Sequence, residues 1–206
     1  MARKKSRNRT KSTVLTAKIV KMLFVLMISF IASLSLIGDF SPIIPGVQKN
    51  DVSEAATFIE SIAPAAQQMQ KQYGVLASIS IAQAILESEW GNSELSSVYN
   101  NLYGMKGDSL ENTVLLSTKE FYNGEWVTVQ ADFKVYDSWA SSVQDHASLI
   151  ANGTTWNADQ YAPVLQAKTY REAAQALQDC GYATDPDYAN KLIAVIEQNT
   201  LYNYDS

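Results

Sequence analysis

The sequence has few of the side chains that usually bind metals or form covalent intermediates, since its 206 residues include one cysteine and one histidine. A lone Cys180 excludes a disulfide bond within the chain. Together with a lone His146, it also argues against a zinc site of His and Cys ligands and against a Cys-His nucleophilic pair. The sequence therefore implies neither a metal nor a cofactor, and we interpret Cys180 and His146 as structural residues.

Acidic residues are absent from the first 38 positions, although the chain contains 21 of them. Residues 1–21 carry eight Lys or Arg, and residues 22–38 (MLFVLMISFIASLSLIG) carry no charge. A basic flank before an apolar run is typical of export signals, and this run is at the short end for a membrane span. Because no clean small-residue cleavage site follows, we expect residues 22–38 to be an uncleaved transmembrane anchor. A cleaved signal peptide is the alternative.

The remainder of the chain, from Asp39 onward, is strongly acidic, with a formal charge of −13. This charge would repel phosphates, so we expect no nucleic-acid partner. Residues 1–21 would stay in the cytoplasm, residues 39–52 contain Pro42, Pro45 and Gly46 and would form a linker, and residues 53–206 are long enough for one domain with a real core. We expect this domain to act outside the cell as a monomer.

Hydrophobic spacing in residues 53–206 predicts a mainly α (α+β) domain. A first helix is expected from Ser53 to Gly74, with Pro64 bending or restarting it, and a second from about 75 to 90, with Gly91 as its stop. A third is expected from 138 to 153. Two more should run from the capping box Thr169–Glu172 to Leu177 and onward from the N-cap Asp185. Residues 112–136 are rich in Val, Thr, Tyr and Phe around Asn123-Gly124, which predicts a β-hairpin lobe. A cleft between the body and the lobe would suit an extended substrate.

The stretch AILESEWGNS places an acid, Glu87, at the edge of the buried stripe of a helix, within its last turn. A buried carboxyl and the negative end of the helix dipole both disfavour the charged form, so each raises the pKa. A glutamic acid that keeps its proton near neutral pH can act as a general acid. A solvated or salt-bridged glutamate at a helix end is the plainer alternative.

Four segments in order resemble the bacterial cell-wall β-N-acetylglucosaminidases of glycoside hydrolase family 73. They are AQAILES-x-WG-x-S at Ala82–Ser93, NLYGMK at Asn101–Lys106, STKEFYNG at Ser117–Gly124 and GYATDPDY at Gly181–Tyr188. The resemblance covers about residues 53–202. It implies a lysozyme-like fold, cleavage of the β-1,4 bond from N-acetylglucosamine to N-acetylmuramic acid in peptidoglycan, and Glu87 as catalytic acid. Glu89 departs from the family, which usually has a small residue there, and we expect its side chain to be solvated.

Glycoside hydrolysis usually needs a second carboxylate. The hairpin offers Glu120, Glu125, Asp132 and Asp137, and the resemblance favours Glu120, which shares a strand face with Thr118 and Tyr122. The acetamido group of the substrate is an alternative nucleophile. Sugars are gripped by aromatic faces and side-chain amides, and the residues we expect to bind the glycan are Trp90, Asn101, Tyr103, Tyr122, Tyr182 and Tyr188.

Two other functions are compatible with the sequence. A muramidase or a lytic transglycosylase would use a similar acid but cut the other glycosidic bond or form an anhydro product. A catalytically silent glycan-binding module is the alternative outside enzymes, and the departure at Glu89 is the feature that favours it.

Overall fold

The computed structural model describes residues 49–107, 112–122 and 125–205, and within these ranges it leaves out the side chains of residues 49–53, 119–122, 125 and 126. The predicted anchor, residues 22–38, lies outside this part of the chain. Among the helices within these ranges, none is both long and apolar enough to cross a bilayer.

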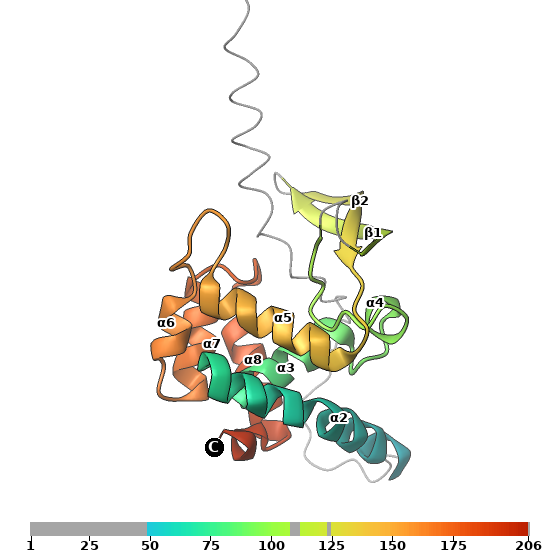
Figure 1. The fold of residues 1–206 in the computed structure, drawn as a ribbon. Helices are drawn as coiled ribbons and strands as arrows, with labels where there is room; N and C mark the ends of the chain where they lie inside the picture. Colours follow the sequence, from blue (N-terminus) through green and yellow to red (C-terminus); the bar gives the residue numbers. More distant parts are fainter. Residues whose placement is uncertain (1–48, 108–111, 123–124, 206) are drawn as a thin grey trace, which may run out of the picture.

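The domain is a body of packed helices from which a single two-stranded antiparallel sheet projects (Figure 1). This confirms the prediction of a mostly helical domain with a β-hairpin lobe. The elements are α2 (Lys49–Tyr73), α3 (Ala77–Ser88), α4 (Glu94–Ser97), β1 (Thr113–Tyr122), β2 (Glu125–Lys134), α5 (Trp139–Asn152), α6 (Ala162–Gln166), α7 (Tyr170–Asp179), α8 (Tyr188–Gln198) and the 3-10 helix η1 (Leu201–Tyr204).

Helix α3 occupies the centre of the body, in contact with α2, α7, α8 and η1. Its sequence ASISIAQAILES is dominated by small and aliphatic residues, and every residue from Ala77 to Ile85 is buried. Small side chains let the neighbouring helices approach from all sides, and a helix that is apolar all round is a core helix. Asp205, at the far end of the chain, caps α3 by accepting hydrogen bonds from the Ser78 backbone N–H (2.7 Å) and hydroxyl (2.6 Å).

The hairpin is joined to the body through the segment that follows Asn101. Phe133 forms an isolated bridge with Lys106, and the Lys134 N–H donates to the Met105 carbonyl over 2.9 Å. The buried Asn101 side chain completes this junction, because its amide nitrogen donates to the carbonyls of Met105 (2.8 Å) and Lys134 (2.9 Å). The base of the lobe is therefore fixed to the loop that follows α4.

Several predicted boundaries differ from the structure. Helix α2 begins at Lys49, four residues before Ser53, and continues through Pro64. Helix α8 begins at Tyr188 with Asp187 as its N-cap, so the assignment of Asp185 as N-cap was wrong. The Asp185 carboxylate instead accepts from the Asp187 N–H over 2.9 Å and pairs with Lys191, which closes a turn ahead of the helix. The short elements α4, α6 and η1 were not predicted.

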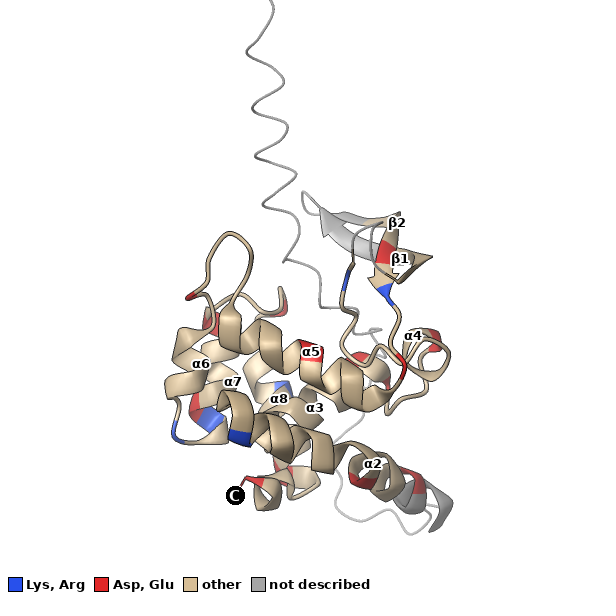
Figure 2. Ribbon diagram, in the orientation of Figure 1, with Lys and Arg blue, Asp and Glu red and all other residues tan. Residues whose placement is uncertain are grey.

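Acidic and basic residues lie interspersed over the elements of the helical body (Figure 2). Where the body carries ion pairs, they join neighbouring surface elements, as Arg171 at the start of α7 does with Glu197 at the end of α8. Exposed pairs of this kind stabilise a fold by about 0–1 kcal/mol each. The fold therefore depends mainly on the apolar packing around α3.

Candidate active site

Glu87 lies in the last turn of α3, where the helix leaves the core. Its side chain is partly exposed, whereas its neighbours Ile85 and Ser88 are buried. The Tyr188 hydroxyl donates a hydrogen bond to Glu87 Oε1 over 2.9 Å, and the Gln83 amide nitrogen donates to that hydroxyl over 3.1 Å. Within the described residues, no Lys or Arg forms an ion pair with Glu87. The carboxyl is thus enclosed by neutral groups and has access to solvent.

This enclosure raises the pKa of Glu87 from 4.5 to about 8. Desolvation is the main cause, and the hydrogen bond from Tyr188 opposes it because it favours the charged form. At neutral pH the group therefore holds a proton next to solvent, which is the state that a general acid requires. The interpretation of Glu87 as a solvated or salt-bridged glutamate does not fit this environment.

Four buried rings, those of Tyr103, His146, Tyr182 and Tyr188, form a wall behind the Glu87 carboxyl. Tyr188 stacks on Tyr182, with ring centroids 5.7 Å apart and an interplanar angle of 21°. The Tyr182 hydroxyl lies 3.0 Å from His146 Nε2, and the imidazole of His146 in turn stacks on Tyr103 at 3.9 Å and 9°. The Tyr103 hydroxyl closes the wall by donating to the Ser80 carbonyl of α3 over 3.2 Å.

The residues expected to grip the glycan occupy two kinds of place. Four of them are at most 1% exposed, so they offer no free face to a sugar in this conformation; they are Asn101, Tyr103, Tyr182 and Tyr188. Instead, Asn101 fixes the hairpin base and the three tyrosines build the wall behind Glu87. Trp90 is partly exposed and packs edge-on against Phe58 at 6.1 Å, so it retains a surface that a ligand could meet. The Tyr122 side chain lies outside the described part.

Glu120, the expected second carboxylate, lies on β1 opposite Val127. Its side chain is outside the described part, so only its register is known. Directly paired residues share a face of an antiparallel sheet, and alternate pairs share the same face. Position 120 therefore falls on the same face as Phe133, which is buried at the base of the hairpin beside Lys106.

The turn after Glu87 departs from the prediction of a helix that runs to Trp90. Helix α3 ends at Ser88, and Glu89, Trp90 and Gly91 have φ values of 53°, 60° and 78°. The N–H groups of Glu89 and Trp90 both donate to the Ile85 carbonyl. Trp90 and Gly91 therefore lie outside the helix and share no helical face with Glu87, so a sequence-based placement of these two residues on the face of Glu87 is wrong. Glu89 is exposed, in agreement with the solvated side chain predicted there.

We expect Gly91→Ala to destabilise the fold more than Gly74→Ala. Both glycines have left-handed backbones (φ 78° and 80°), but a Cβ at Gly91 would lie 2.8 Å from Trp139 and 2.9 Å from Phe58, whereas a Cβ at Gly74 meets nothing within 4 Å. Overpacking adds about 1–3 kcal/mol to the backbone strain that both variants share. Urea unfolding of the two variants measures the difference, and equal losses would show that the ring cluster can yield.

Two residues of this site were not proposed from the sequence as parts of it. Gln83, one turn before Glu87 on α3, had no predicted role in the site, and His146 was interpreted as structural. A polar residue four positions before the acid on a buried helix is the signal that identifies Gln83. The partners of His146 come from loops at Tyr103 and Tyr182, which no local spacing reveals.

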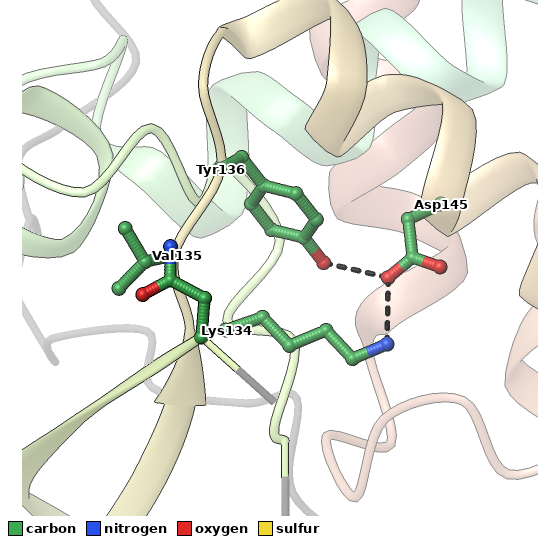
Figure 3. A pocket seen from close by; sticks show the side chains of 5 residues that line it. Lys134, Val135, Tyr136 and Asp145 are labelled. Atoms are coloured by element: carbon green, nitrogen blue, oxygen red, sulfur yellow. Dashed lines mark hydrogen bonds and ion pairs between the residues drawn. The ribbon is translucent and has the colours of Figure 1, made fainter. Parts of the chain in front are cut away.

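A hollow of about 280 Å³ lies at the base of the hairpin and contains none of the predicted site residues. Figure 3 shows Lys134 and Tyr136 converging on Asp145 of α5. The Lys134 ammonium lies 3.0 Å from Asp145 Oδ2, and the Tyr136 hydroxyl donates to the same oxygen over 2.7 Å. These contacts attach the end of β2 to α5. Within the described ranges, no group of three or more His, Cys, Asp or Glu residues is arranged to hold a metal ion.

Comparison with known proteins defines the class. The glucosaminidase family, described as mannosyl-glycoprotein endo-beta-N-acetylglucosaminidase, matches residues 63–201. The chain is 44% identical over 206 residues to the exo-glucosaminidase LytG of Bacillus subtilis, covering all of this chain and 70% of that protein. It is 40% identical over 166 residues to a probable N-acetylmuramidase of Lactococcus lactis, covering 77% of this chain and 38% of that one.

A solved structure gives the same result. The catalytic domain of the autolysin Auto from Listeria monocytogenes superposes with a TM-score of 0.69 at 35% identity, over 80% of this chain and all of that domain. The protein is therefore a glycoside hydrolase. The chain belongs to the glucosaminidase family, glycoside hydrolase family 73, which confirms the resemblance, and its helical body with a two-stranded hairpin is consistent with the lysozyme-like fold.

Proposed function

We propose that this protein hydrolyses the glycan backbone of peptidoglycan, with Glu87 as the general acid that protonates the glycosidic oxygen. The observation that carries the proposal is the enclosed Glu87 carboxyl, which is held by Tyr188 and has a pKa near 8. Relatives named as glucosaminidase and probable N-acetylmuramidase support a cell-wall glycan as substrate. Glu120, or the acetamido oxygen of the substrate, would act on the opposite face of the sugar.

The bond we propose is the β-1,4 link from N-acetylglucosamine to N-acetylmuramic acid. The family description and the Bacillus relative support it, and the name of the lactococcal relative favours the alternative bond. Purified cell wall digested with the protein and examined by mass spectrometry should show reducing N-acetylglucosamine ends. Reducing or anhydro muramic ends would contradict this choice of bond. Early release of only small fragments would indicate exo action, and a mixture of lengths would indicate endo action.

We further propose that the N-terminal segment holds the domain at the outer face of the cell membrane. The basic flank at residues 1–21 and the uncharged run at residues 22–38 support this, since such a flank keeps the N-terminus in the cytoplasm. The full-length protein should sediment with membranes, and protease added to cells whose wall has been removed should degrade the domain. Recovery in the medium with a shortened N-terminus would indicate a cleaved signal peptide, and protection inside the cell would contradict export.

A further inference from the structure

His146 contacts two of the three tyrosines in the wall behind Glu87. Its imidazole is fully buried on α5, stacks on Tyr103 and contacts the Tyr182 hydroxyl through Nε2. Tyr182 stacks on Tyr188, which donates to Glu87. A continuous series of direct contacts therefore runs from α5, through the loop before α8, to the carboxyl on α3.

We propose that His146 is a positioning residue for catalysis, which holds Tyr182, and through it Tyr188, so that the Tyr188 hydroxyl and the surrounding rings enclose the Glu87 carboxyl. This inference rests on the proposed function of Glu87. His146 does not touch the reacting atoms. Its effect reaches the acid through the two tyrosines.

The chemistry of the wall favours a positioning role over simple space filling. An apolar ring would stack on Tyr103 equally well, but it would leave the buried Tyr182 hydroxyl without the partner it has at Nε2. An unpaired buried hydroxyl costs about 1–3 kcal/mol, so Tyr182 would turn toward another partner and carry the ring stacked on Tyr188 with it. The hydrogen bond to the imidazole therefore fixes the orientation of Tyr182 and not only its burial.

The buried imidazole is neutral near pH 7. Burial lowers the pKa of His146 to about 3, although the adjacent Asp145 acts in the opposite direction. The titratable groups in contact with it are Tyr103 and Tyr182, and burial raises the pKa of both phenols. Burial disfavours the charged form of each of these three groups, so the wall stays neutral near pH 7 and we expect the titration at this site to belong to Glu87.

The test compares His146→Phe with Val143→Ala. The first variant keeps a flat ring against Tyr103 and removes only the partner of Tyr182. The second removes volume from the same buried face of α5, one turn earlier, at a residue outside the wall.

We expect His146→Phe to lower kcat by roughly tenfold with little change in KM, because misplacement of a catalytic group reduces the rate more than binding. In the plot of kcat against pH, the fall at high pH (the upper limb) should move to lower pH. A looser wall admits water to Glu87, and water lowers the pKa of its carboxyl. Val143→Ala should lower the melting temperature and leave that limb in place.

Two further measurements keep the inference testable in every case. Tyr182→Phe removes only the hydroxyl that His146 contacts, so it tests the same hydrogen bond if His146→Phe does not fold. It should lower kcat and shift the upper limb of the pH profile to lower pH, as His146→Phe does. Carbon NMR titration of Glu87 reports the enclosure of its carboxyl without any substrate, which separates this inference from the proposed function. An unchanged Glu87 titration and kcat in the His146 and Tyr182 variants, or an equal change in Val143→Ala, would overturn the positioning role.

Discussion

Glu87→Gln should lower the rate of cell-wall hydrolysis by about 10²–10⁴-fold, the range that general acid–base catalysis contributes. Glutamine has the size of the glutamic acid that it replaces, and its amide oxygen can still accept the hydrogen bond from Tyr188. It has no acidic proton to give to the leaving oxygen. Release of soluble fragments from labelled cell wall measures the loss, and circular dichroism checks that the variant is folded.

The matched control for this result is Glu89→Gln. Glu89 lies two residues further along the chain, is exposed and caps α3 through its backbone, so removal of its charge should leave the rate close to that of the wild type. A Glu87→Gln protein that still hydrolyses the wall at the normal rate would mean that another acid does the chemistry. A wild-type protein that binds the wall and never cleaves it would mean that this chain is a silent glycan-binding module.

The second large effect concerns stability, since Glu87→Gln should make the protein more stable than the wild type at alkaline pH. Below pH 4.5 the Glu87 carboxyl is protonated in both the folded and the unfolded chain, so the folded state keeps its full stability. Between pH 4.5 and about 8 the unfolded chain loses this proton and the folded chain retains it, so the free energy of unfolding falls as the pH rises. Above about pH 8 the carboxyl is ionised in both states, so the free energy of unfolding does not fall further on account of Glu87.

The size of this effect follows from the shift of the Glu87 pKa from 4.5 to about 8. Each pH unit corresponds to about 1.4 kcal/mol, so the wild type loses at most about 5 kcal/mol across this window. Glutamine does not titrate and avoids the loss. Urea unfolding at a series of pH values should show the two proteins diverging through this window, while Glu89→Gln follows the wild type. Parallel curves for the wild type and Glu87→Gln would show that the carboxyl is not desolvated in the folded protein.

Glu87 supports catalysis at a cost in the stability of the fold. A carboxyl that is able to donate a proton near neutral pH must be held where its charged form is unfavourable, and that environment reduces the stability of the fold. The Tyr188 hydroxyl offsets part of the cost because it stabilises the charged form. The site therefore needs both the enclosing wall and the hydrogen bond, which set the pKa between the value of a free glutamate and that of a fully sealed one.

The sequence was sufficient where the signals are local. The hairpin follows from β-branched and aromatic residues on both sides of Asn123-Gly124, and its strands lie within the predicted region. Helix α5 begins and ends at the residues expected from Ser138 and Gly153, since the Ser138 hydroxyl accepts from the Ser141 N–H and the Gly153 N–H closes the last turn. The end of α3 was misplaced because a run of three left-handed residues, two of them not glycine, is uncommon, and in this turn Trp90 packs against Phe58 of α2.

By itself, the sequence determined a helical domain with a hairpin lobe and an acid at the end of an apolar helix. These are properties of neighbouring residues, fixed by side-chain spacing and capping. Only the tertiary structure decided what surrounds that acid, because Tyr188 is 101 positions from Glu87 along the chain and His146 meets Tyr182 across 36. The pKa of a carboxyl depends on the groups within a few ångströms of it in space, and these are brought together only when α3, α5 and α8 pack.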